Sequence, residues 1–122
     1  MFAAVLSPDI AWATAVSDRI LNRCTPKGRY IEVEVFESPM KLLSHLDKKP
    51  VSTVIMSVDH ADELNHAKSI SEKGVKLILL TDSNEIAIKA YSVGPEYCTY
   101  KDPDDEDLDR ISSIIFCNCK LE

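Results

Sequence analysis

Glycine is scarce in this sequence, and its scarcity excludes one large class of function. Only three of the 122 residues are glycine, at positions 28, 74 and 94. Loops that hold the phosphates of nucleotide cofactors are rich in glycine, because backbone N–H groups must approach the ligand closely. None of the three follows the first or the third strand predicted below. The sequence therefore argues against a nucleotide cofactor site and leaves open only a small anion near Thr81 and Lys101.

Basic residues and long apolar runs are also lacking. The chain carries 14 Lys and Arg against 20 Asp and Glu, which gives a formal net charge of −6. Contact with nucleic-acid phosphates needs clustered Lys and Arg, so we expect no direct nucleic-acid contact by this domain. No apolar run approaches the length of a bilayer span, and the N-terminus lacks a signal-peptide pattern. We expect a cytoplasmic domain without membrane contact.

Cysteine and histidine are present without the spacing of a metal site. None of the four cysteines forms a C-x-x-C motif, and the nearest pair, Cys117 and Cys119, would lie on different faces of a helix. The three histidines, His45, His60 and His66, supply no matching ligands. The sequence therefore predicts reduced thiols and no metal.

The stretch over residues 51–57 is the centre of the predicted fold. It is short, β-branched and mostly apolar, and it lies between Pro50 and Asp59. Such a run is typical of a central strand of a parallel sheet, buried on both faces. Its last residue, Ser57, would lie at the carboxyl edge of the sheet, where open α/β folds place their sites.

Apolar runs and three- to four-residue periodicities alternate along the rest of the chain. Further strands are predicted over 2–6, 30–36, 75–80 and 97–100, and helices over 10–24, 39–46, 61–73, 84–93 and from the acidic run 102–107 onward. Five strands alternating with five helices predict an α/β fold, a doubly wound parallel sheet with helices on both faces. The chain is long enough for one domain, which we place at residues 1–120, and we interpret Leu121-Glu122 as a cloning remnant.

Local signals refine three of these helices. Ser7-Pro8 and Ser38-Pro39 each predict an N-cap serine followed by proline at the first helical position. In the second helix, Met40, Leu42, Leu43 and Leu46 are predicted to face inward. The carboxylates of residues 102–107 suit the positive N-terminal end of the last helix, and we interpret them as a solvated helix start.

Polar residues follow several of the predicted strands and would meet at the carboxyl edge. They are Ser7, Asp9, Ser57, Thr81 and Lys101. Their spacing resembles that of the receiver domain of bacterial response regulators (CheY-like), and the resemblance covers essentially the whole chain. The resemblance implies an acidic pair after the first strand that holds magnesium, a phosphoacceptor aspartate after the third, and a Thr and a Lys that contact the phosphoryl oxygens. Thr81 and Lys101 match the last two positions, and 93–95 matches a Gly-Ala step.

The departures from this pattern predict a pseudo-receiver. Ser7-Pro8 stands at the acidic pair, Ser57 at the phosphoacceptor position, and Cys98 at the position of the aromatic switch residue. With one well-placed carboxylate at most, Asp9, a magnesium site is doubtful, so we expect no cofactor. Without a metal and a carboxylate nucleophile, conventional phosphorylation should fail. Lys101 would then be balanced by Asp9 or by a backbone carbonyl.

Three alternatives stay open at this point. Asp59 becomes the acceptor if the third strand runs two residues further, because it would point to the same side as Ser57. Ser57 itself could be modified, although His60 on a neighbouring loop is a poor candidate for its base. A flavodoxin-like module that binds a small anion is the third. We expect no enzyme, since no nucleophile–base pair or pair of carboxylates is evident.

A weaker resemblance concerns the output of the domain. Residues 36–43 and 85–93 resemble receivers joined to LytTR-type DNA-binding domains. This likeness implies a regulatory domain that controls transcription through a DNA-binding output domain. Receivers commonly pair through the fourth helix, fifth strand and fifth helix, so we expect protein partners or self-association there. Here this surface would carry Lys89, Tyr91, Tyr97, Asp107 and Arg110.

Overall fold

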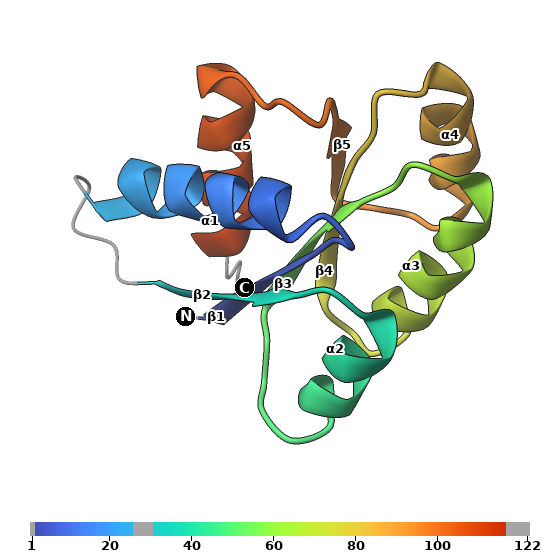
Figure 1. The fold of residues 1–122 in the computed structure, drawn as a ribbon, viewed down its shortest axis with the longest axis horizontal. Coiled ribbons are helices and arrows are strands. Elements are labelled where there is room, and N and C mark those ends of the chain that lie inside the picture. Colours follow the sequence, from blue (N-terminus) through green and yellow to red (C-terminus); the bar gives the residue numbers. More distant parts are fainter. Residues whose placement is uncertain (1, 26–30, 117–122) are drawn as a thin grey trace.

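The computed structural model describes residues 2–25 and 31–116, which form one parallel sheet with helices on both faces (Figure 1). The five strands are β1 (Phe2–Leu6), β2 (Glu32–Phe36), β3 (Thr53–Ser57), β4 (Lys76–Leu80) and β5 (Tyr97–Thr99). The helices are α1 (Ile10–Cys24), α2 (Pro39–Leu46), α3 (Leu64–Ser71), α4 (Asn84–Lys89) and α5 (Asp105–Phe116), with 3₁₀ turns η2 (Ala61–Glu63) and η3 (Ala90–Ser92). The predicted doubly wound fold is confirmed.

The strand order β2-β1-β3-β4-β5 places β3 at the centre. All five residues of β3 are buried, as predicted for a strand covered on both faces. The parallel pairing sets Leu6 of β1 opposite Met56 of β3, so the residues that follow these strands emerge side by side. The chain leaves β1 toward β2 on one side and reaches β3 on the other, which makes this the switch point where open α/β sheets form sites.

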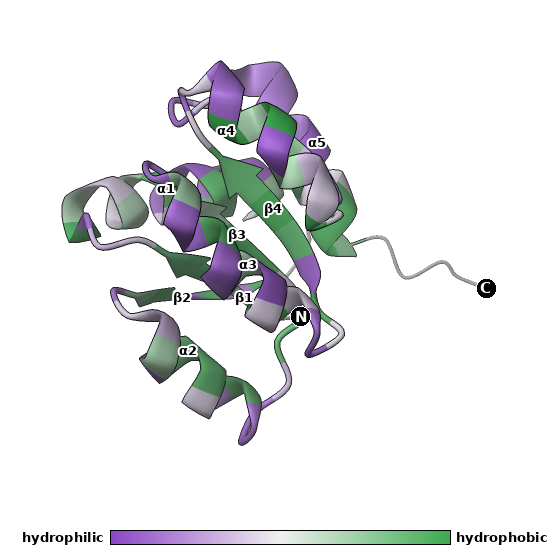
Figure 2. Ribbon diagram, turned by 90° about the vertical axis from the view of Figure 1, so that its right-hand side faces the viewer, coloured by the Kyte–Doolittle hydropathy of each residue, from purple (hydrophilic) through white to green (hydrophobic). Residues whose placement is uncertain are grey.

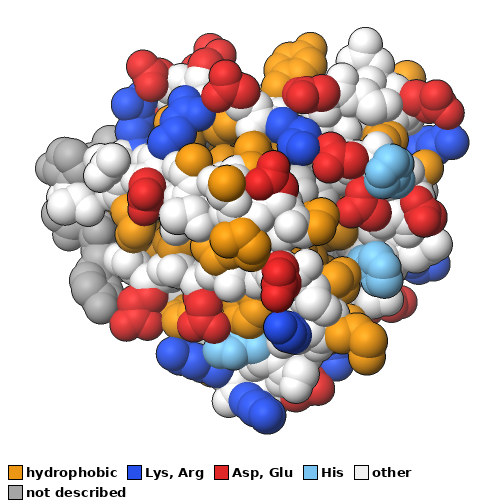
Figure 3. Space-filling model, in the orientation of Figure 1, with side chains coloured by type: hydrophobic (Ala, Val, Ile, Leu, Met, Phe, Trp, Pro, Cys, Tyr) orange, Lys and Arg blue, Asp and Glu red, His pale blue; other side chains and the backbone are white. Residues whose placement is uncertain are grey.

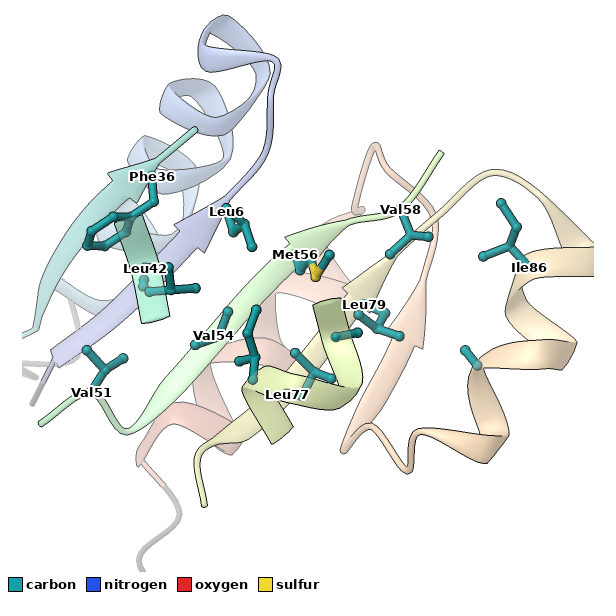
Figure 4. Close-up of a cluster of buried hydrophobic side chains, with 14 residues drawn as sticks. Leu6, Phe36, Leu42, Val51, Val54, Met56, Val58, Leu77, Leu79 and Ile86 are labelled. Carbon is teal, nitrogen blue, oxygen red and sulfur yellow. The ribbon is translucent and has the colours of Figure 1, made fainter. Parts of the chain in front are cut away.

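Two apolar layers cover the sheet. On one face, α1 and α5 pack over side chains such as Val5, Ile55 and Ile78. On the other, α2, α3 and α4 cover Leu6, Val54, Met56 and their neighbours (Figure 4). β3 and β4 are coloured as hydrophobic along nearly their whole length, whereas the helices also show hydrophilic residues (Figure 2). The sequence periodicities predicted this contrast between apolar central strands and helices with one apolar and one polar face.

Several predicted boundaries are wrong by a few residues. Val51 is buried but precedes β3, which begins at Thr53. The helix predicted over 61–73 begins as a 3₁₀ turn and ends at Ser71, and the one over 84–93 becomes a 3₁₀ turn at Ala90. Both are followed by a glycine with positive φ, 85° at Gly74 and 73° at Gly94, a conformation that favours glycine.

Two local predictions are wrong for a physical reason. Ser7 is not the N-cap of α1. Asp9 caps the helix, because its Oδ1 accepts a hydrogen bond of 3.1 Å from the N–H of Trp12. Met40 does not face inward, since it is 78% exposed on the first turn of α2. Ser38 does precede Pro39 at the start of α2, although no side-chain bond forms at this cap.

The acidic residues at the start of α5 are bound to α1. Arg19 Nη1 lies 2.9 Å from Asp102 Oδ1, and Arg23 Nε lies 2.7 Å from Asp109 Oδ1. The hydrogen bond to Asp109 raises the pKa of Arg23 above its ordinary value. Figure 3 shows acidic and basic side chains side by side over this part of the surface. Asp102 of the predicted acidic run and Asp109 beyond it therefore pair with α1. Asp102 is also exposed to solvent, and the sequence predicted only this solvated state.

Three further observations complete the fold. Residues of the described part form no helix that is both long and apolar enough to cross a membrane. Cys24 is buried and Cys98 is half-buried, and both are free thiols. Tyr30, Cys117, Cys119 and the predicted cloning remnant Leu121-Glu122 lie outside the described residues.

Candidate functional site at the carboxyl edge

Ser7 and Ser57 form a buried, hydrogen-bonded pair at the centre of the carboxyl edge. Each serine is only 1% exposed. The Ser57 hydroxyl donates a hydrogen bond of 2.8 Å to Ser7 Oγ, which also accepts one of 3.1 Å from the N–H of Asp9. Ser7 fails as a helix cap because its hydroxyl is turned toward these two donors. The residue at the predicted phosphoacceptor position is therefore buried and engaged with another hydroxyl.

Asp9 lies beside this pair, but its side chain caps α1. Its carboxylate accepts from Trp12 N–H at the start of α1, where a negative charge also suits the helix dipole. The prediction that Asp9 or a backbone carbonyl balances the charge of Lys101 is wrong. The structure gives that role to Asp59.

Lys101 lies in the loop after β5, two residues beyond Thr99, and three segments of the chain bind it. Its Nζ lies 2.9 Å from Asp59 Oδ1, in an ion pair whose side chains are 21% and 44% exposed. Its backbone N–H donates to Asp82 Oδ1 at 3.1 Å. Its carbonyl oxygen accepts a 2.8 Å bond from Trp12 Nε1, and the same indole ring lies 5.6 Å from Nζ. We call Lys101 and these three partners the Lys101 network.

Thr81 is nearly buried and belongs to a turn. Its Oγ1 accepts a 3.2 Å hydrogen bond from the N–H of Ser83, and Ser83 in turn caps α4 through the N–H of Ile86. Thr81 N–H donates to Thr99 of the neighbouring strand at 2.9 Å. Of the predicted edge residues, Ser57 ends β3, whereas Ser7, Thr81 and Lys101 follow β1, β4 and β5. Among these four, a side-chain hydrogen bond joins only the two serines.

Glu63 also binds backbone groups at this edge, and the sequence analysis did not identify it. Its Oε1 accepts from the N–H groups of Asp59 and His60 at 2.8 and 2.9 Å. His60 forms the N-cap of the 3₁₀ turn η2 in a reciprocal capping box with Glu63. The spacing of three residues between His60 and Glu63 is a capping signal that could have been recognised. His60 thus caps the turn, and the Ser57 hydroxyl binds Ser7.

The chemistry open to this edge is limited. Within residues 2–25 and 31–116, no three His, Cys, Asp or Glu side chains converge as a metal site requires. The donors that an anion would use are bound to carboxylates of the chain, with Lys101 on Asp59 and the 59–60 amides on Glu63. A serine nucleophile needs an adjacent base, whereas the partner of Ser57 is another serine. The arrangement does not favour magnesium, phosphoryl transfer or the anion-binding alternative.

A second region, formed by α4, β5 and α5, combines polar bonds with exposed apolar side chains. The Tyr97 hydroxyl donates a 2.6 Å hydrogen bond to Asp107 Oδ1, and the Arg110 guanidinium lies 5.9 Å from the Tyr97 ring. Burial and the bond to Asp107 raise the pKa of Tyr97. Burial alone would raise the pKa of Asp107, but the bonds from Tyr97 and from the N–H of Asp104 hold it below its usual value. These bonds join β5 to the first turn of α5.

A groove of about 700 Å³ separates α4 from β5. Residues from both elements line it, among them Ala87, Ile88, Tyr91, Tyr97 and Cys98. Ile88 is 69% exposed and Tyr91 83% exposed, so large apolar groups flank this α4–β5 groove in contact with solvent. Burial raises the pKa of the Cys98 thiol, which keeps it protonated and weakly nucleophilic at neutral pH.

The comparisons with known proteins identify the fold. No protein-family model and no curated protein matches the sequence. A two-component response regulator from Clostridium difficile superimposes with a TM-score of 0.71 at 11% identity over 94% of each chain. The BeF3-activated DrrB receiver domain gives 0.66 at 20% identity, over 93% of this chain and 95% of that one. A CheY-like protein (tadZ) from Pseudomonas aeruginosa PAO1 gives 0.66 at 12% identity, over 100% and 98%.

The class defined by these similarities is the flavodoxin-like α/β sheet with strand order β2-β1-β3-β4-β5. Within it, the chain has the fold of response regulator receiver domains, because all of the similar structures named above carry that fold along nearly their whole length. The resemblance noted in the sequence is thereby confirmed at the level of structure. Identities this low establish the fold and not the activity.

Proposed function

We propose that this chain is a receiver-like regulatory domain of a bacterial response regulator that signals without conventional phosphorylation and acts through protein contacts. The observation that carries the proposal is the hydrogen bond between Ser57 and Ser7. A receiver needs a carboxylate at this point, both to accept the phosphoryl group and to help hold the metal. Here the position is a neutral hydroxyl, 1% exposed and bonded to a second hydroxyl.

The charges around the pair support the same proposal. Phosphoryl transfer depends on cations that neutralise the developing negative charge. The one lysine in the predicted pocket, Lys101, already has Asp59 at 2.9 Å. Asp9, the one carboxylate left near the first strand, accepts from the helix N-terminus. An incoming phosphoryl group would have to displace these internal partners.

The α4–β5–α5 surface is the part of the molecule best suited to a protein partner or to a second copy of the chain. Its exposed Ile88 and Tyr91 beside a groove offer apolar area, and Arg110 and Glu96 offer charge. Apolar anchors with a polar rim are what protein–protein interfaces use. We propose that the regulatory signal is a change of partner or of association state at this surface.

An NMR titration tests the proposal at the site. Magnesium is added to the chain, then beryllofluoride, and the amide resonances of residues 7, 57, 81 and 101 are followed. The DrrB receiver domain, which is activated by BeF3, is the positive control. We expect shifts in the control and none beyond weak scattered metal effects here. Localised shifts around Ser57 and Lys101 at ordinary millimolar concentrations would refute the proposal.

The output we propose is a DNA-binding domain carried elsewhere in the protein, so that this domain controls transcription without touching DNA. The acidic net charge of −6 supports the division of labour. In a gel-shift assay near physiological salt, the isolated chain should leave duplex DNA unbound. Binding that weakens steeply with salt would contradict this part of the proposal.

A second candidate is a phosphorylated receiver that uses Asp59. One observation favours it, because Lys101 Nζ lies 2.9 Å from Asp59 Oδ1, the kind of lysine contact that a phosphoacceptor requires. Two observations oppose it. Asp59 follows β3 by two residues and lies outside the strand, and within the described residues it belongs to no group of three His, Cys, Asp or Glu side chains that could hold a metal ion. The first proposal therefore fits the edge better.

A further inference from the structure

The loop between β5 and α5 is bound on both of its sides to distant parts of the chain. Toward the carboxyl edge, Lys101 contacts Asp59 and Asp82. Toward α1, its carbonyl oxygen accepts from Trp12, and the next two residues, Asp102 and Pro103, accept from Arg19. Short loops at sheet edges usually keep several groups bound to water, so this concentration of internal partners calls for an explanation.

Lys101 uses three of its groups for three different segments. Nζ binds the loop after β3, the backbone N–H binds the loop after β4, and the carbonyl binds α1. The partners lie 42, 19 and 89 residues away in sequence. The network therefore forms only when these segments are all in place, and loss of one partner weakens the position of the others.

The same loop begins directly after the strand that lines the α4–β5 groove. Tyr97 and Cys98 line the groove, and Lys101 follows them within four residues. On the far side of the loop, the Tyr97 hydroxyl binds Asp107 in the first turn of α5. β5 is an edge strand of three half-buried residues, so side-chain bonds have a large share in fixing it.

We propose that the Lys101 network is a conformational device of this fold, which holds the β5–α5 loop in one conformation. It fixes the β5–α5 loop and, through β5, the groove-lining face, using backbone and side-chain groups of this chain. Trp12 and Asp59 act as positioning residues that hold Lys101. A fixed groove-lining face would favour partner binding there, and this consequence rests on the function proposed above. The conformational claim does not rest on it, because it concerns the loop itself.

Two variants test the network while keeping the sheet intact. Lys101→Met removes the ammonium and keeps the backbone bonds, and Trp12→Phe removes the indole bond to the Lys101 carbonyl. Lys89→Met is the matched control, because it deletes a lysine from an exposed ion pair with Glu85 on α4. The measurement is amide hydrogen exchange of residues 97–102, with the β3 amides as an internal reference for global unfolding.

In each test variant, exchange of the loop amides should accelerate at least about tenfold relative to the β3 amides, because the loop opens locally. In Lys101→Met, emission of Trp12, the only tryptophan of the sequence, should also change as the cation leaves the ring. The control should stay within about twofold of the parent. Loop exchange within twofold in Lys101→Met, or an equal acceleration in β3, would overturn the proposal. Neither result depends on the phosphorylation or partner tests, so the two failures are distinguishable.

Discussion

The carboxyl edge and the α4–β5–α5 surface differ in how they use their polar groups. At the edge, Ser57 is 1% exposed, and its hydroxyl, the Lys101 ammonium and the 59–60 amides are bound within the chain. On the other surface, Ile88 is 69% and Tyr91 83% exposed, beside an open groove.

The difference shows that likeness to a phosphorylation site and the ability to bind a partner belong to different regions of this molecule. The edge carries the residues that resemble a phosphorylation site, yet its donors are satisfied by internal partners. The α4–β5–α5 surface carries no chemical motif, but it has the open apolar area that binding requires. In this molecule, recognisable residues mark the edge that resembles a phosphorylation site, and exposed apolar side chains mark the region open to solvent.

The largest effect is expected at the serine pair. Ser57→Asp places a carboxylate in a buried position whose neighbour is a hydroxyl, so the free energy of unfolding should fall by about 3 kcal/mol or more. Ser57→Ala, the control, should cost only about 1 kcal/mol. Urea denaturation measures both. An aspartate variant as stable as the parent would show that the edge is open to a carboxylate, contrary to this account.

A charge on the open surface should affect association and leave the fold intact. Ile88→Glu should weaken self-association in sedimentation experiments by about tenfold or more, because a charge replaces an apolar anchor. Met40→Glu is the matched control, since Met40 on α2 is a large apolar side chain that is also mostly exposed, at 78% against 69% for Ile88. Equal effects of both substitutions, or a parent chain that never associates, would contradict self-association through this surface.

The bond between Tyr97 and Asp107 should make part of the stability depend on pH. The pKa of Asp107 is lowered in the folded chain, so its contribution is present above the unfolded pKa and is lost as pH falls. The pKa of Tyr97 is raised, so its contribution is present below the unfolded pKa and is lost at high pH.

Tyr97→Phe should therefore cost about 1 kcal/mol near neutral pH, and its deficit should shrink toward both acid and alkali. Unfolding curves across the pH range measure this, with Tyr91→Phe on the same surface as the control. A deficit that is constant with pH would indicate that only packing is lost.

The smallest effect is expected for an exposed pair on α4. Lys89 lies 3.3 Å from Glu85 one turn earlier, and both side chains are more than half exposed. Lys89→Met should change the free energy of unfolding by about 0.3 kcal/mol. A loss above about 1 kcal/mol in urea would mean that the open surface is tied together more tightly than the contrast assumes.

The sequence predicts the fold well because fold signals are local. The apolar run ending at Ser57 and the three- and four-residue periodicity over 10–24 each specify an element and its buried side. The alternation of such elements then limits the topology to a few choices. The ends of helices and short strands were less predictable, because these boundaries depend on tertiary contacts. Examples are the end of α3 at Ser71 and the end of β5 at Thr99.

The site was only partly predictable. The positions of Ser57, Thr81 and Lys101 at strand ends follow from strand order alone. Side-chain partners do not, because they join residues far apart in sequence, as in the bond between Trp12 and Lys101 across 89 positions. Ser7 illustrates the limit, since a serine before a helix is equally suited to capping it and to binding a neighbouring strand.

Intact-mass measurement of the chain after incubation with acetyl phosphate and magnesium tests the central claim most directly. The account predicts the mass of the unmodified chain, because the acceptor position is a buried serine bonded to Ser7. Addition of an acid-stable phosphoryl group that Ser57→Ala abolishes would show that the serine pair opens and reacts. A labile phosphoryl group that Asp59→Asn abolishes would contradict the account and establish Asp59 as the acceptor.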